Sequence, residues 1–86
     1  MNITVHTTPI CHQCKLTKKM LDRYGAAYEV IDLTADAEAR EFVIGTLGYT
    51  AAPVVTVRDD DGELLSHWSG LRPDMIGIWA DGGKAA

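Results

Sequence analysis

The sequence predicts a single α/β domain in which a four-stranded mixed sheet has helices on both faces, with the element order β-α-β-α-β-β-α. Three observations support this fold class. The chain has 86 residues, enough for one hydrophobic core but not for two. Short runs rich in β-branched residues alternate with longer segments of helical periodicity, a pattern typical of α/β proteins. The last two strand-like runs are separated only by a short turn ending in Asp-Gly, which predicts a hairpin.

The first two predicted elements are a strand over residues 2–6 and a helix over residues 11–24. Ile3 and Val5 alternate with polar neighbours, as in a half-buried strand. Within the second segment, apolar side chains recur at every fourth position, which indicates one face of an amphipathic helix. Gly25 is expected to end this helix, because glycine readily adopts the left-handed conformation of a C-terminal cap.

A second strand is predicted over residues 28–33, followed by a second helix that ends at Gly48. Thr34 is expected to be the N-cap of this helix, because its hydroxyl can accept a hydrogen bond from a free backbone N–H group of the first turn. Helical spacing predicts that four apolar side chains of the helix face the sheet: Ala39, Phe42, Val43 and Leu47.

The second half of the chain predicts a strand, a hairpin turn, a returning strand and a last helix. The continuous run PVVTV at residues 53–57 is typical of a strand that is buried on both faces. Residues 58–62 (RDDDG) predict the hairpin turn, and residues 63–68 return antiparallel. The last helix is expected to begin near Pro73, which suits a first-turn position, and to pack two side chains against the sheet: Ile76 and Trp79.

One domain is therefore expected over residues 1–80, with residues 81–86 as a flexible C-terminal tail. The first two strands are joined through a helix, so they should be parallel with a right-handed crossover. The last two strands should be antiparallel, which makes the sheet mixed.

Composition and charge exclude several classes of function. The net charge of −4 argues against nucleic acid as a partner. No run approaches the roughly 18 apolar residues of a membrane span, and the first residues lack the pattern of a signal peptide. A cytoplasmic protein is expected, in a compartment where disulfides are rare unless they are transient and catalytic.

The charge is unevenly distributed along the chain. Residues 11–24 contain four basic side chains and one acidic one, a net +3, so the remaining residues carry −7. A basic surface beside the cysteines could attract an acidic partner towards them. The same pattern is also that of an ordinary solvated helix face, and charge alone does not distinguish the two.

Cys11 and Cys14, the only cysteines of the chain, form a Cys-x-x-Cys pair at the start of the first predicted helix. Free N–H groups and the helix dipole favour a negative charge there, so the pKa of the Cys11 thiol should fall. Cys14 lies one turn further into the helix, within disulfide distance of Cys11. We therefore expect Cys11 to attack a substrate disulfide and Cys14 to resolve the mixed disulfide.

His12 lies between the two cysteines and has two interpretations. Its imidazolium could stabilise the Cys11 thiolate and raise the reduction potential, or the side chain could simply face solvent. Zinc binding by the two cysteines with His6 and His67 is the main alternative to redox chemistry, although it lacks a second closely spaced pair of ligands. Lys15 stands where haem attachment would need histidine.

Pro53 gives the second chemical signal. A proline that begins a strand directly after a loop favours a cis peptide bond, here between Ala52 and Pro53. Such a turn would leave the backbone groups of Ala52 unpaired and facing the cysteines, where an extended cysteine-bearing peptide could pair with them as an added strand. A plain boundary between loop and strand is the alternative interpretation.

Three motifs now stand in the order of one known family: Cys-His-Gln-Cys at residues 11–14, Ala-Pro-Val-Val at 52–55 and Trp-Ser-Gly-Leu-Arg-Pro-Asp at 68–74. The chain resembles the NrdH-redoxins, small glutaredoxin-like members of the thioredoxin superfamily, from Ile3 to about Trp79. The last motif discriminates best, because the family carries Trp-Ser-Gly-Phe-Arg-Pro-Asp or a close variant there. Leu71, in place of the phenylalanine, is a departure from the family pattern, though an apolar one. The resemblance implies catalytic residues Cys11 and Cys14 and a substrate-binding surface made of His12, Gln13, Ala52, Pro53, Trp68, Ser69, Gly70, Arg72 and Asp74.

The resemblance also implies a specific function. NrdH-redoxins donate electrons to class Ib ribonucleotide reductase, on its large subunit, and are reduced by thioredoxin reductase with NADPH as the ultimate source. A monomer without a bound cofactor or metal is expected. Two other functions stay open: a glutathione-dependent glutaredoxin, and a non-catalytic or zinc-binding interaction module. Gln13 stands where glutaredoxins commonly have tyrosine, and no partner for the glutathione ammonium is evident.

Overall fold

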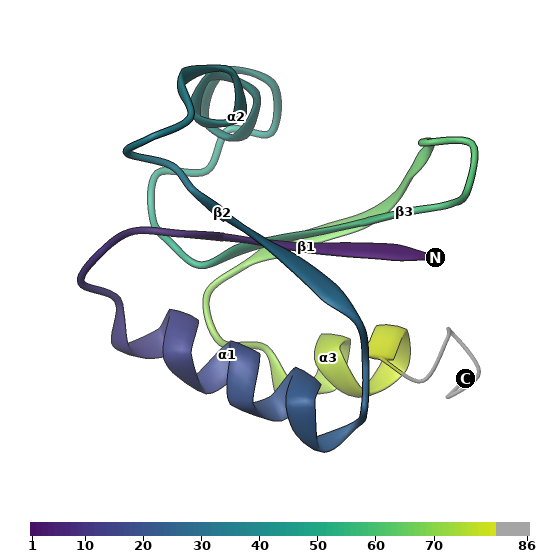
Figure 1. Ribbon diagram of the computed structural model, residues 1–86. Helices are drawn as coiled ribbons and strands as arrows, with labels where there is room; N and C mark the ends of the chain where they lie inside the picture. Colours follow the sequence, from purple (N-terminus) through teal and green to yellow (C-terminus); the bar gives the residue numbers. More distant parts are fainter. Residues whose placement is uncertain (81–86) are drawn as a thin grey trace.

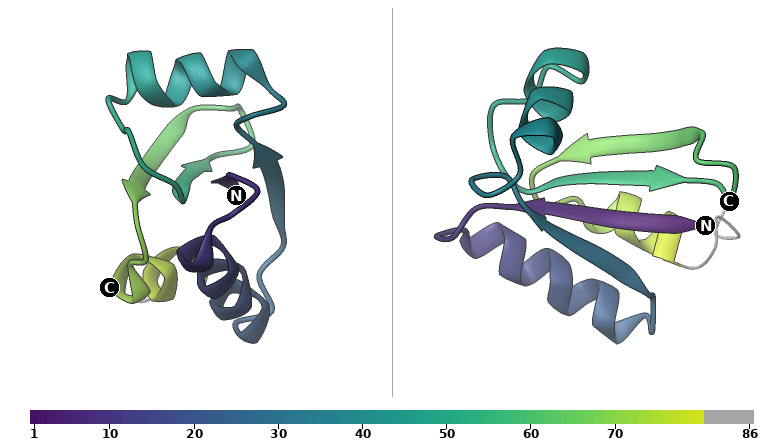
Figure 2. Two further views of the ribbon diagram at one scale, coloured as in Figure 1. Left: turned by 90° about the vertical axis from the view of Figure 1, so that its left-hand side faces the viewer. Right: turned by 45° about the horizontal axis from the view of Figure 1, so that its top comes forward.

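The structure, a computed structural model, describes residues 1–80 and has the predicted order of elements. The sheet has the strand order β2-β1-β3-β4, with β1 and β2 parallel and the other neighbouring pairs antiparallel. Helix α2 covers one face, and α1 and α3 lie side by side on the other (Figures 1 and 2). The predicted thioredoxin-like α/β fold is confirmed. The elements are β1 (Asn2–Thr7), α1 (His12–Arg23), β2 (Tyr28–Asp32), α2 (Ala37–Glu41), η1 (Phe42–Thr46), β3 (Val54–Arg58), β4 (Leu64–Ser69) and α3 (Pro73–Ala80).

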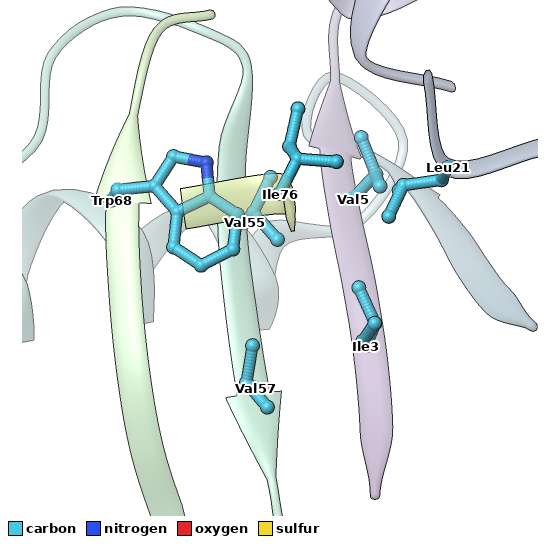
Figure 3. Packing of buried hydrophobic residues seen from close by; sticks show 7 residues of the cluster. All are labelled: Ile3, Val5, Leu21, Val55, Val57, Trp68 and Ile76. Carbon is cyan, nitrogen blue, oxygen red and sulfur yellow. The ribbon is translucent and has the colours of Figure 1, made fainter. Parts of the chain in front are cut away.

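The larger of two hydrophobic clusters fills the space between the sheet and the pair α1 and α3. Alternate residues of the strands point into this layer, and one leucine of α1 and one isoleucine of α3 meet them, as Figure 3 shows. Ile3, Val5 and Ile76, which the sequence predicted to face the core, are buried there, whereas Tyr24, at the end of the periodic stripe of the first helix, is 50% exposed. The cluster consists of Ile3, Val5, Leu21, Val55, Val57, Trp68 and Ile76.

The smaller cluster lies under the second helix, on the opposite face of the sheet. Leu33, Val43 and Val54 are buried in it. All four side chains that were predicted to face inward from this helix belong to the cluster or pack against it. The continuous burial of Val54 to Val57 follows, because β3 lies centrally in the sheet and has helices on both faces.

The predicted N-cap of the second helix is wrong. Asp36, not Thr34, caps α2: its Oδ1 accepts a hydrogen bond from the backbone N–H of Ala39 at 3.0 Å. The hydroxyl and the backbone N–H of Thr34 both donate to Asp32 Oδ1, at 2.7 and 2.8 Å. Because the Thr34 hydroxyl donates to this carboxylate in the preceding turn, the helix begins two residues later than expected.

The turns follow the sequence closely. Gly25, Gly48 and Gly62 adopt positive φ angles where the first helix, the second helix and the hairpin turn end. The second helix finishes in a π-helical turn, η1, which the sequence pattern did not predict. No helix within residues 1–80 is long and apolar enough to cross a membrane. The predicted tail, residues 81–86, lies outside the described residues.

Candidate redox site

Cys11 and Cys14 form a disulfide bond where β1 gives way to α1. The two sulfur atoms are 2.05 Å apart and the two Cα atoms 5.2 Å apart. Cys11 is the N-cap of α1, with extended backbone angles (φ −148°, ψ 102°), and its Sγ accepts a hydrogen bond from the backbone N–H of Cys14 at 3.1 Å. The sequence produces this geometry because the helix begins at His12, directly after the first cysteine.

The start of α1 favours a negatively charged sulfur at Cys11. The bonded Sγ occupies the position of an N-cap acceptor, which a thiolate fills with a stronger, charge-assisted hydrogen bond once the disulfide is reduced. The first turn of α1 contains no acidic side chain that would oppose this charge. Reduction therefore leaves a thiolate-stabilising site at Cys11.

The two cysteines differ in accessibility. Cys14 is buried, with 2% of its surface exposed, whereas Cys11 is partly exposed. A partner sulfur can approach Cys11 from solvent, while Cys14 can reach only what is already attached to its neighbour. This difference supports the predicted roles of attacking and resolving cysteine.

The three predicted motifs meet at one end of the sheet. In Figure 1 the start of α1, the segment that leads into β3 and the segment that leaves β4 all lie at the same end, opposite the N-terminus. The Ala52–Pro53 peptide bond is cis, as predicted. The N–H of Gly70 donates to the carbonyl of Pro53 at 2.8 Å, and the hydroxyl of Ser69 donates to the carbonyl of Ala51 at 2.9 Å. The last motif is therefore hydrogen-bonded directly to the proline loop.

Gln13 connects the cysteine motif to the same surface. A Cβ atom placed on Gly70 would lie 3.8 Å from Gln13 Oε1, so the two residues are close neighbours. Gly70 also has φ +83°, a conformation that side chains disfavour. Gln13, Pro53 and Gly70 thus come from three distant parts of the chain and lie together.

Arg72 and Asp74 bind each other. The guanidinium Nε and Nη2 atoms donate to the two carboxylate oxygens at 3.0 and 2.9 Å, and about half or more of each side chain is exposed. The hydrogen bond from Arg72 lowers the pKa of Asp74 to about 2. This pairing gives two predicted substrate-binding residues a structural partner, and the two charges offset each other.

Trp68 and His12 lie differently from the other predicted residues. Trp68 is only 3% exposed and belongs to the larger core cluster, so its side chain holds β4 in place and does not face a partner. His12 is exposed, and its side chain forms no hydrogen bond with any residue in the described range 1–80. Its proposed influence on the Cys11 thiolate stays a prediction.

The four residues of the zinc hypothesis do not come together. The sulfurs of Cys11 and Cys14 are bonded to each other, the ring of His6 is buried against the carbonyl of Val54, and the ring of His67 contacts another side chain. Among residues 1–80, no group of three or more His, Cys, Asp or Glu side chains is arranged to hold a metal ion.

Apart from Ala52, sequence reasoning did not identify the residues on the other side of the proline loop as part of a site. A shallow apolar hollow of about 150 Å³ lies between this loop and the second helix, and Tyr49 forms part of its wall. Residues from four separate segments of the chain line the hollow, so no local sequence pattern predicts it. The lining consists of Thr8, Leu33, Thr34, Arg40, Val43, Ile44, Tyr49, Thr50, Ala51 and Ala52.

Fold and site together define a class of protein. A four-stranded mixed sheet, a Cys-x-x-Cys disulfide at the N-terminus of the first helix and a neighbouring cis-proline are the features of a thioredoxin-fold thiol-disulfide oxidoreductase. A family model described as Glutaredoxin matches residues 3–61 and agrees with this class.

Comparison with known proteins narrows the class. The chain is 40% identical over 76 residues to the glutaredoxin-like protein NrdH of Escherichia coli K12, covering 88% of this chain and 85% of that protein. It is also 40% identical over 74 residues to the gene 56 protein of Mycobacterium phage D29, covering 86% and 77%. The solved structure of NrdH-redoxin from Escherichia coli superimposes with a TM-score of 0.77 at 35% identity, covering 92% and 95% of the two chains. The chain belongs to the glutaredoxin family, as a glutaredoxin-like protein of the NrdH type.

Proposed function

We propose that this protein is the electron donor of a class Ib ribonucleotide reductase and that thioredoxin reductase reduces it, with NADPH as the source of electrons. The observation that carries the proposal is the accessible Cys11 beside a buried Cys14, with Gln13, which lies between them in the sequence, close to Gly70 of the last motif. The Escherichia coli relative is described as a glutaredoxin-like protein with a thioredoxin-like activity profile, which supports the same direction of electron flow here.

The chemistry follows from the positions of the two sulfurs. In the reduced protein, the Cys11 thiolate attacks the partner disulfide, forms a mixed disulfide and releases one partner thiolate. The Cys14 thiolate then attacks Cys11 Sγ, re-forms the bond seen in the structure and releases the second partner thiolate. Two electrons pass to the partner, whose thiolates take up two protons. The reductase restores the dithiol with two electrons from NADPH.

The cytoplasm is the compartment that suits this cycle, because its reducing poise keeps the carrier in the dithiol form between turnovers. We propose that the protein works there as a monomer. The basic side chains of α1, which begins at the redox site, supply positive charge that would favour an acidic partner surface. This attraction should weaken as salt is added, since exposed charges are screened over about 8 Å at physiological ionic strength.

A direct comparison of two electron sources tests the proposal. The oxidised protein is mixed with NADPH and thioredoxin reductase, or with NADPH, glutathione and glutathione reductase, and NADPH consumption is followed by absorbance. We expect rapid consumption only with thioredoxin reductase, and transfer of the electrons to the large subunit of ribonucleotide reductase when that subunit is added. Cys11→Ser is the control and should consume none.

Rapid reduction by glutathione alone would contradict the proposal and favour a glutathione-dependent glutaredoxin. The Arg72–Asp74 pair argues against that outcome, because each side chain already has its charged partner. Reduction by thioredoxin reductase without transfer to ribonucleotide reductase would limit the proposal to a general dithiol carrier.

A further inference from the structure

Tyr49 and His67 form a contact that disulfide exchange itself does not use. The phenol oxygen of Tyr49 lies 2.8 Å from Nδ1 of His67, and the two rings meet edge to face with centroids 5.6 Å apart. His67 belongs to β4, whereas Tyr49 belongs to the loop between η1 and β3. The contact therefore ties this loop to a strand of the sheet.

The contact belongs to a series along β4. His67 and Ser69 are two residues apart and so lie on one face of the strand. The hydroxyl of Ser69 donates a hydrogen bond to the carbonyl of Ala51, and the N–H of the next residue, Gly70, donates one to the carbonyl of Pro53. Residues 49, 51 and 53 are thus hydrogen-bonded to residues 67, 69 and 70, respectively, at the end of β4. The Tyr49–His67 pair is the first of these three attachments.

Ala52 lies between two of these attachments. Within the described part of the chain, its backbone N–H and carbonyl have no hydrogen-bond partner. It directly precedes Pro53 in the segment that leads into β3, and this segment lies at the end of the sheet where α1 begins (Figure 1). Ala52 also lines the apolar hollow. A loop that is already fixed loses little conformational freedom when a peptide pairs with Ala52, and this raises affinity.

We propose that Tyr49 and His67 are positioning residues, which hold the proline loop so that the backbone of Ala52 can pair with an extended, disulfide-bearing segment of a protein substrate. The inference rests on the thiol-disulfide exchange of the proposed function, but not on ribonucleotide reductase as the partner. It separates two substrate classes. A protein disulfide brings a peptide backbone to Ala52, whereas a small aromatic disulfide brings none.

The pair suits this role whichever nitrogen of the His67 ring carries a proton. A neutral histidine ring can accept the hydrogen bond from the Tyr49 hydroxyl at Nδ1, and a ring protonated at Nδ1 can donate to the phenol oxygen instead. The contact thus has a hydrogen-bonded form in either state of His67. Substitution, rather than a change of pH, is the appropriate test.

The test compares the reduction of insulin with the reduction of 5,5′-dithiobis(2-nitrobenzoate), a small disulfide. Dithiothreitol regenerates the protein in the insulin assay. Tyr49→Phe and His67→Leu should raise KM for insulin about threefold with little change in kcat. A factor of three corresponds to about 0.7 kcal/mol, at 1.4 kcal/mol per factor of ten, which is the range of one net hydrogen bond. The rate with the small disulfide should not change.

Two further variants separate positioning from general damage. His67→Asn should keep the wild-type KM for insulin, since an amide oxygen near the position of Nδ1 can accept from Tyr49. Tyr28→Phe removes another exposed tyrosine hydrogen bond, which the Tyr28 hydroxyl donates to Asp22 at 2.9 Å near the end of α1 that is remote from the cysteines. This variant should reduce both disulfides with the kinetic constants of the wild type. Thermal unfolding of each variant confirms that it is folded.

Several outcomes would overturn the inference. An unchanged KM for insulin in Tyr49→Phe and His67→Leu would do so. An equal loss of activity with insulin and with the small disulfide would also do so, as would a His67→Asn variant whose KM for insulin rises as much as that of His67→Leu. A wild-type protein that reduces neither disulfide would instead refute the oxidoreductase function itself. The two failures are thus distinguishable.

Discussion

Cys11 and Cys14 share one bond but have different surroundings, and this difference matters most at the scale of single residues. Cys11 is the capping residue of α1 and faces solvent in part, while Cys14 is buried inside the first turn. The sequence predicted the pair and its place at a helix start. It also predicted the order of attack, for which the unequal exposure supplies the physical reason.

Separate serine variants should divide the reaction into its two steps. Cys11→Ser should reduce no disulfide, because the accessible nucleophile is lost. Cys14→Ser should perform only the first attack and accumulate a mixed disulfide with its partner, since no second thiolate can release it. Non-reducing electrophoresis and mass spectrometry would detect the covalent complex. Sustained turnover by Cys11→Ser would contradict these roles.

His6 should make stability depend on pH. Burial lowers its pKa from the ordinary value of 6.5, although Nδ1 contacts the carbonyl of Val54 at 2.9 Å. Below pH 6.5 the unfolded chain therefore takes up a proton that the native protein does not, so the free energy of unfolding should fall as the pH decreases. Urea unfolding between pH 8 and pH 5 measures this.

The matched variant for that experiment is His6→Asn, which keeps an amide donor for the Val54 carbonyl but does not titrate. The variant should lose less stability than the wild type over the same pH interval. Equal slopes for the two proteins would show that carboxylates, and not His6, cause the acid sensitivity.

Residues of the site differ in how far the sequence predicts them. Pro53 and Gly70 can be recognised in the sequence, because a cis peptide bond favours proline and a positive φ angle favours glycine. Tyr49 and His67 are 18 positions apart in the chain, and nothing local indicates that they meet. The burial of Trp68 becomes clear only from the register of the sheet, in which it pairs with the buried Val55.

At the scale of elements, the start of α2 shows how capping decides where a helix begins. Asp36→Ala removes the acceptor of the Ala39 N–H bond and should cost about 1 kcal/mol of unfolding free energy, within a range of about 0.5–2. Asp36→Asn should keep most of the stability, because asparagine is an equally good N-cap. Urea midpoints measure both effects. A loss of equal size in the two variants would rule out capping as the cause.

Sequence reasoning placed the second helix and its buried face correctly but not its first residue. Thr34 and Asp36 are both good N-cap residue types, so residue type alone does not choose between them. The choice depends on Asp32, whose carboxylate accepts both donors of Thr34. The π-helical end of the helix is likewise not indicated by the periodicity of the sequence.

At the scale of the whole molecule, the two hydrophobic clusters share the central strand β3, which contributes Val54 to one and Val55 to the other. A domain of this size has an unfolding free energy of about 4–13 kcal/mol. Ile76→Ala, in a fully buried position, should cost about 2–5 kcal/mol, a large share of the total.

The exposed Ile10 provides the matched control for that prediction. Its side chain is 97% exposed, so Ile10→Ala should change the stability by about 0.5 kcal/mol or less. Chemical unfolding of both variants gives the comparison. Similar losses at the two positions would mean that the burial of Ile76 is not what stabilises α3.

Two of the three strand pairings were predictable from the sequence, whereas the strand order and the antiparallel pairing of β1 with β3 are known only from the structure. A helix between the first two strands requires a parallel pair, and the short turn after β3 requires an antiparallel one. The order β2-β1-β3-β4 then brings the cysteines, the proline and the glycine of the last motif to one end of the sheet. Contacts between side chains at that end depend on the exact packing and so required the structure.

The burial of Cys14 directly behind Cys11 also bears on damage by peroxides. A peroxide that reaches the outer thiolate converts it to a sulfenic acid, which further oxidant would turn irreversibly into a sulfinic acid. Here a second thiol lies within bonding distance and is shielded from the same oxidant, so it can displace water from the sulfenic acid first. The product is the same internal disulfide that ordinary turnover makes. The reductant of the normal cycle can therefore reduce it and restore the active dithiol.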